Sequence, residues 1–120
     1  MALTGQAQAE RTLFRGAASM CVEEGTTIVG LRGHIDVTTL PQLVDVFAAA
    51  IADRTGPVVV DLAQAGFIDV ACARAVGSAA HGLALHDRRL TVRSPSRVAL
   101  MLLCTLGLSA LVEPDAELKR

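Results

Sequence analysis

The sequence lacks the cysteine pattern of a metal centre or a disulfide framework. Its three cysteines, Cys21, Cys72 and Cys104, are odd in number and lie far apart along the chain. A small, odd count is typical of a protein in a reducing cytoplasm. The acidic residues and histidines show no metal-ligand spacing either. We therefore expect no metal site and no cofactor.

The chain also lacks an excess of charge and a long hydrophobic run. Its formal net charge is -1, and Lys119 is the only lysine, so the electrostatic signature of a nucleic-acid or anionic-membrane binder is missing. The most apolar stretch, 100–111, contains Cys, Thr, Gly and Ser and is too short and mixed to span a bilayer. No basic start followed by an apolar core indicates a signal peptide. These absences predict a cytoplasmic protein with no nucleic-acid partner and no membrane insertion.

Motifs of catalysis are missing as well. Ser78, His81 and Asp87 fall on or beside one expected helix, without the strained Gly-x-Ser-x-Gly turn of a hydrolase. The sequence contains no phosphate-binding loop and no paired acid–base arrangement. We therefore predict a protein that is not an enzyme and has no catalytic residues.

The elements that are present alternate between strands and helices. Apolar and alternating runs predict strands at 18–23, 26–31, 58–60 and 89–93, and helical spacing predicts helices at 40–51, 70–86 and 98–106. A short strand or extended piece is expected at 108–112. This order favours an α/β domain at 18–113, with a mixed sheet of roughly four to five strands packed against three or four helices. Residues 1–17 read as a flexible arm and 114–120 as a charged tail.

Three helix ends carry recognisable signals. Thr39 and Gln42 have the spacing of a capping box at the first helix. Ser94-Pro95-Ser96 is typical of a helix entry, and Gly107 is expected as the C′ residue that closes the last helix.

The chain is organised around residues 58–72. Val58 to Val60 reads as a strand buried on both faces, and Gln64 and Gly66 are expected to break it. Asp69 stands where a helix N-cap is expected, before an Ala-rich segment. Such a strand, connection and helix start form a βα unit, which places recognition at the carboxyl end of the strand.

At these residues the sequence resembles the STAS family, the domain shared by sulphate transporters and anti-sigma factor antagonists. The similar segments are Gly33-His-Ile-Asp36, Val58-Val-Val-Asp-Leu62, Phe67-Ile-Asp69 and Ser94-Pro-x-x-Val98. In many members a serine follows the last Asp and is phosphorylated by a partner kinase. Val70 occupies that phosphoacceptor-equivalent position, Ala71 replaces a second serine, and Cys72 replaces a glycine.

The resemblance implies a partner-binding surface with the residues Gly33, His34, Asp36, Asp69, Val70, Ala71 and Cys72. It implies an anti-sigma factor antagonist that binds an anti-sigma factor of the kinase type, as a monomer or weak homodimer, without a phosphorylation switch at Val70. Two alternatives stay open: a non-enzymatic scaffold subunit of a stress-signalling or lipid-transport complex, and a small-ligand binding module.

Individual residues of this surface also have more than one interpretation. Asp69 and Asp36 cap a helix start, contact the partner, or do both. Cys72 is either a small packing residue or a partly exposed redox thiol, alone or in a disulfide with Cys104 if their Cα atoms lie within about 7 Å. Cys104 otherwise reads as a core residue of the last helix.

Overall fold

The structure is a computed structural model that describes residues 17–114. The predicted arm before Ala17 and the predicted tail after Pro114 lie outside the described residues. The strands are β1 Ala18–Glu23, β2 Thr26–Ile35, β3 Val58–Ile68 and β4 Leu90–Arg93. The helices are α2 Leu40–Asp53, α3 Val70–Ala84 and α4 Arg97–Thr105, followed by the 3-10 turn η1 Ser109–Leu111.

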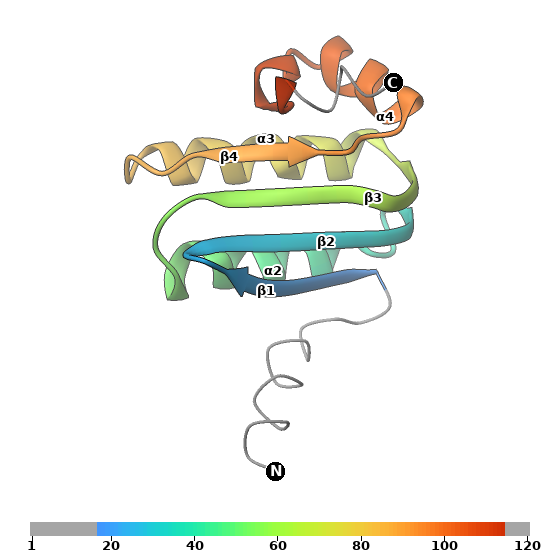
Figure 1. Ribbon diagram of the computed structural model, residues 1–120. Helices are drawn as coiled ribbons and strands as arrows, with labels where there is room; N and C mark the ends of the chain where they lie inside the picture. Colours follow the sequence, from blue (N-terminus) through green and yellow to red (C-terminus); the bar gives the residue numbers. More distant parts are fainter. Residues whose placement is uncertain (1–16, 115–120) are drawn as a thin grey trace.

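One mixed sheet of four strands organises the domain, in the order β1-β2-β3-β4. β1 is antiparallel to β2 through a tight turn at Glu24 and Gly25, whose φ values of 52° and 83° suit a hairpin. β2, β3 and β4 are parallel to one another. Their ends at Ile35, Ile68 and Arg93 therefore lie along one side of the sheet, which we call the carboxyl edge (Figure 1).

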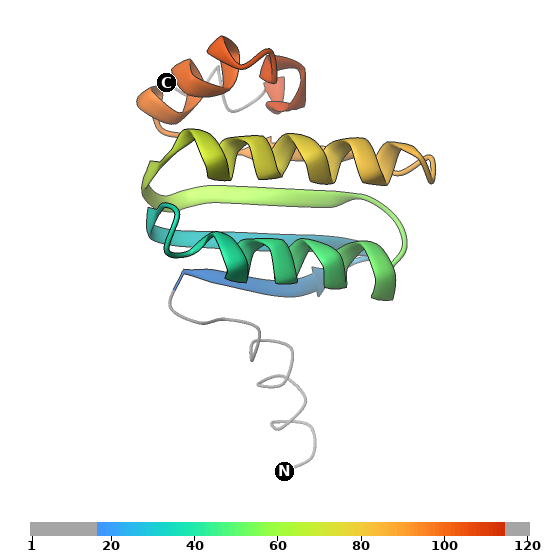
Figure 2. The same cartoon turned by 180° about the vertical axis from the view of Figure 1, so that it is seen from behind.

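Helices α2 and α3 lie side by side on one face of the sheet, and α4 lies beyond β4 (Figure 2). The core between sheet and helices is apolar and includes Val29, Val60, Leu43, Val76 and Leu83. Both α2 and α3 begin at the carboxyl edge, because each follows a parallel strand. The α/β class with a mixed sheet, predicted from the sequence, is confirmed.

The two central strands are longer than predicted. β3 does not break at Gln64 and Gly66 but continues to Ile68, and β2 continues beyond Leu31 to Ile35. The two extensions pair with each other across two register shifts, at each of which β3 contains one residue more than β2. The predicted end of this strand at Leu31 is therefore wrong, since Gly33, His34 and Ile35 also belong to the strand.

The helix ends agree only in part with their sequence signals. Thr39 makes no side-chain cap to α2, so the predicted capping box is wrong. Ser96 caps α4 by accepting from the N–H of Ala99 at 3.1 Å. Gly107 has a φ of 78° and donates to the carbonyl of Cys104, as the predicted C′ residue of a Schellman-type end.

The last part of the described chain differs from the expected strand. Residues 109–111 form the 3-10 turn η1, and only Val112 pairs with the sheet, through a bridge to Val92. Leu108 packs against Gly77 of α3, where an added Cβ would lie 3.1 Å from a Leu108 methyl. No helix within residues 17–114 has the length and apolar character needed to cross a membrane.

Arg88 ties the far end of α2 to the start of β4. Its guanidinium donates to the carbonyls of Ala50, Ile51 and Gly56 at 3.1, 3.0 and 2.8 Å. Carbonyls at a helix C-terminus have no intrahelical donor, so this side chain supplies their hydrogen bonds.

Candidate functional site

The segments that follow β2 and β3 meet at the carboxyl edge. The N–H of Asp69 donates to the carbonyl of Ile35 at 3.0 Å. The thiol of Cys72 donates to the carbonyl of Asp36 at 3.3 Å. These two contacts hold the turn after β2 against the first turn of α3, so the predicted residues Asp36, Asp69 and Cys72 form one site.

Asp69 is the N-cap of α3. Its Oδ1 accepts from the N–H of Cys72 at 2.9 Å, and its carbonyl accepts from Ala73 at 2.9 Å. Its backbone is extended, with φ -93° and ψ 176°, as an N-cap residue requires. The capping role that we predicted for Asp69 is confirmed, and its role in partner binding stays a prediction.

Asp36 organises the turn between β2 and α2. It does not cap α2, because the N-cap residue is Thr39 and no side chain caps this helix, so the predicted capping role of Asp36 is wrong. Its Oδ1 accepts from the N–H and the hydroxyl of Thr38 at 3.0 and 2.6 Å. Thr39 closes the turn, because its hydroxyl donates to the Asp36 carbonyl and accepts from the Asp36 N–H. The hydrogen bonds from Thr38 lower the pKa of Asp36 below its usual value. The carboxylate therefore stays ionised at neutral pH.

Cys72 is buried, as its interpretation as a packing residue requires, and not partly exposed as its interpretation as a redox thiol requires. Its exposed fraction is 0%. Burial, with the neighbouring carboxylate of Asp69, raises the pKa of its thiol to about 12. Cys104, expected in the core, is exposed on the last turn of α4. Both thiols are free, and a redox role for either of them stays a prediction.

The other predicted residues surround this site. Gly33 and His34 are exposed residues of β2, and the ring of His34 lies 5.9 Å from that of Phe67 on β3. Val70 and Ala71 are the first two residues of α3, and both are exposed.

Several large apolar side chains at the carboxyl edge are exposed, and for most of them the sequence analysis did not predict this. Val37 follows β2 and is 65% exposed, Phe67 near the end of β3 is 42% exposed, and Val70 is 44% exposed. Val98, in the first turn of α4, is 64% exposed. An apolar residue next to a strand end is normally assigned to the core, so the sequence gives no signal for this exposure. Val70 is the exception, because the family resemblance had already placed it on the partner-binding surface.

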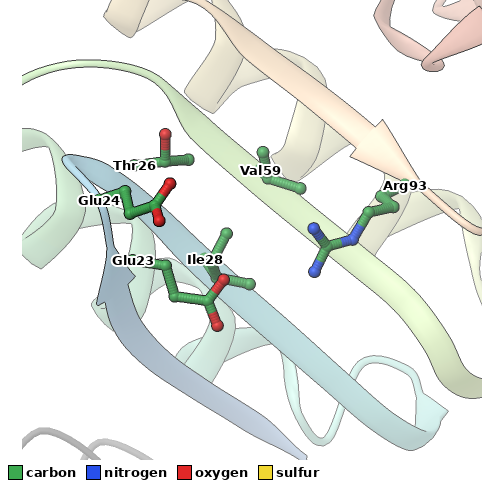
Figure 3. Close-up of a pocket in the computed structure, with 6 residues that line it drawn as sticks. All are labelled: Glu23, Glu24, Thr26, Ile28, Val59 and Arg93. Carbon is green, nitrogen blue, oxygen red and sulfur yellow. The ribbon is translucent and has the colours of Figure 1, made fainter.

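A separate hollow lies over the sheet face that the helices leave uncovered. It measures about 660 Å³ and is lined by Glu23, Glu24, Thr26, Ile28, Val59 and Arg93 (Figure 3). Arg93 forms an ion pair with Asp61 at 2.9 Å. Since its cation is already engaged and two glutamates line the hollow, the hollow does not suit an anionic ligand.

Among residues 17–114, no three His, Cys, Asp or Glu side chains are grouped so that they could hold a metal ion. The thiol of the site, that of Cys72, is buried and protonated. What the edge presents outward is two carboxylates and several apolar side chains.

Comparisons with known proteins identify the family of this domain. Residues 22–113 match the family model described as Mlab, STAS domain. A search of curated proteins found no match. The structure is similar to the Bacillus anti-sigma factor antagonist SpoIIAA in its unphosphorylated form, with 17% identity, a TM-score of 0.72, and 87% of this chain and 95% of that chain covered.

Two further structures have the same fold. An anti-sigma factor antagonist from Mycobacterium paratuberculosis is 19% identical, with a TM-score of 0.70 and coverage of 86% of this chain and 92% of that chain. A sulfate transporter family protein from Wolinella succinogenes is 16% identical, with a TM-score of 0.64 and coverage of 82% and 86%. Identities this low establish the fold, and the family model covers most of the sequence. The chain therefore belongs to the STAS domain family.

Proposed function

We propose that this protein is an anti-sigma factor antagonist, which binds a kinase-type anti-sigma factor through its carboxyl edge and so releases a sigma factor. The observation that carries the proposal is the contact between the Asp36 turn and the first turn of α3. This contact presents two carboxylates and the start of a helix on one surface. Similar structures that are described as anti-sigma factor antagonists have the same fold. The protein itself needs no cofactor and acts as a binding partner, not as an enzyme.

The antagonist lacks the usual switch, because Val70 has no hydroxyl at the start of α3. A phosphate on a side chain there would add roughly -1.5 to -2 charge beside Asp69 and would disrupt a surface that already carries carboxylates. Between Asp69 and Ser78 the sequence offers no other hydroxyl than that of Ser78 itself. Ser78 lies two turns into α3, away from the contact. We infer a protein that its partner kinase does not switch off at this position.

The experiment is incubation with a purified kinase-type anti-sigma factor from the same cells, with and without ATP. The complex should form and persist with ATP, and intact mass with peptide mapping should show no phosphate between Asp69 and Ser78. The matched variant Val70→Ser restores a hydroxyl at the capped helix start and should take up phosphate. A stoichiometric phosphate on the wild-type segment would overturn the absence of the switch. Failure of the wild type to bind would overturn the antagonist function.

A second candidate is a non-enzymatic scaffold subunit of a larger STAS complex, of the stress-signalling or lipid-transport kind. The specific observation in its favour is also Val70, because a permanent assembly has no need of a phosphoacceptor at the binding surface. Co-purification from native cells distinguishes the two: the scaffold would remain with a transporter ATPase or a large assembly. A binding module for a small ligand would retain only the ligand.

A further inference from the structure

Half of the exposed large apolar side chains among the described residues lie at the carboxyl edge. They are Val37, Phe67, Val70 and Val98, which we call the apolar row. Each belongs to a segment near the end of a parallel strand: β2, β3 or β4. β2, β3 and β4 are consecutive in the sheet, so these segments leave it at neighbouring positions along the carboxyl edge (Figure 1).

The exposure of the apolar row does not result from incomplete packing of the core. Ile35, Ile68 and Cys72, from the same segments, are 1%, 3% and 0% exposed and complete the apolar packing under the edge. The side chains of the row are the neighbours that turn outward. Single exposed apolar residues are normal on a protein surface, but a group at one place marks an interaction surface.

The charges beside the row indicate what kind of surface it fits. Asp36 immediately precedes Val37, and Asp69 immediately precedes Val70. Val98 differs, because Arg97 precedes it, so the acidic part of the row is the part with Val37 and Val70. Asp36 is held ionised by its hydrogen bonds to Thr38. A surface with an apolar centre and negative charges beside it is complementary to one with an apolar centre and basic side chains. Protein interfaces commonly have an apolar centre and a polar rim, and the centre supplies most of the affinity.

We propose that Val70, together with Val37 and Phe67, is the apolar centre of the contact with the partner, and that the partner presents an apolar patch bordered by Lys or Arg side chains. Valine at this position is then more than the loss of a phosphoacceptor: its side chain contributes affinity. This inference rests on the proposed function, since it names the chemistry of the same partner at the same surface.

The inference separates the two consequences of placing serine at position 70. Without ATP, no phosphate forms, and the Val70→Ser protein differs from the wild type only in a small side chain that is now polar. If valine were tolerated merely because the switch is dispensable, Val70→Ser would bind as tightly as the wild type. If the Val70 side chain contributes affinity, Val70→Ser binds the partner more weakly before any phosphorylation occurs.

The test measures the affinity of a purified kinase-type anti-sigma factor for each variant by titration calorimetry, without ATP. Val37→Ser and Val70→Ser should each weaken binding about tenfold or more, the effect of truncating a central interface residue. The matched control is Leu85→Ser, because Leu85 is 72% exposed and lies at the opposite end of α3. It should bind like the wild type. Since all three positions are exposed, thermal unfolding should show near-wild-type stability for every variant.

The outcomes distinguish the inference from the function on which it rests. If the wild type binds the anti-sigma factor but Val37→Ser and Val70→Ser bind equally well, the apolar centre is wrong and the antagonist function stands. If the wild type does not bind, both are overturned. If the row instead joins two copies of this chain, sedimentation would show a wild-type dimer that Val37→Ser dissociates, which also overturns the inference.

Discussion

Replacing Asp69 by alanine removes the side chain that caps α3 and should destabilise the domain. The Asp69 Oδ1 is the acceptor for the N–H of Cys72 at 2.9 Å. Loss of an N-cap acceptor costs about 0.5–2 kcal/mol. Cys72 is fully buried, so its released N–H is poorly placed to bond to water, and we expect the upper half of this range. For a domain of this size, each 1 kcal/mol lowers the Tm by about 4–8 °C.

Asp69→Asn is the control that separates capping from charge. Asparagine is as good a cap as aspartate, so the Tm should stay close to that of the wild type, while affinity for a partner with basic side chains should fall. The variant should also lower the pKa of the Cys72 thiol, because the Asp69 carboxylate is one cause of its increase. Thermal unfolding, calorimetry with the anti-sigma factor, and the ultraviolet absorbance of the thiolate against pH measure the three effects. An unchanged Tm for Asp69→Ala would refute the capping argument, and unchanged affinity for Asp69→Asn would leave Asp69 as a cap alone.

Further predictions concern the thiols and the far end of α2. At pH 8, a thiol reagent or oxidised glutathione should modify Cys104 and leave Cys72 unmodified until the protein unfolds; rapid modification of Cys72 in the native state would restore it as a redox candidate. Because burial and the Asp69 carboxylate disfavour the Cys72 thiolate in the folded state, the fold should lose stability as pH rises above about 9 toward 12. Denaturant unfolding of a Cys72→Ala variant should lack that part of the pH dependence. Arg88→Ala should lower the free energy of unfolding by about 2–4 kcal/mol, because three carbonyls lose their charged donor. The Tm should fall by roughly 8 °C or more. A Tm within about 2 °C of the wild type would contradict this expectation.

Helix ends were predicted correctly where few residue types can occupy the position. Asp69 and Gly107 were placed correctly, because an N-cap acceptor and a left-handed C′ residue are strongly selective. The prediction that Thr39 caps α2 was wrong, because its hydroxyl bonds to the backbone N–H and carbonyl of Asp36 instead. The extensions of β2 and β3 could not be predicted from either segment alone, because each strand is held by its pairing with the other.

The candidate site was predicted in its polar part and missed in its apolar part. Asp69 stood out because an acidic residue at a helix start has a recognisable role, and Asp36 stood out because its segment resembles that of the family. Burial is a tertiary property, and helical spacing does not determine it near an element's end. Cys104 was expected in the core but is exposed on α4. The exposure of Val37 and Phe67 became evident only with the strand ends in place.

The most direct test of the account is the binding of a purified kinase-type anti-sigma factor to this protein before and after incubation with ATP. The account predicts a complex of unchanged affinity in both states and an unmodified segment around Val70. With Val70→Ser, it predicts weaker binding at the outset and a further loss once phosphate is added. Absence of a complex with the wild type, or loss of that complex on addition of ATP with phosphate in the first turns of α3, would contradict it.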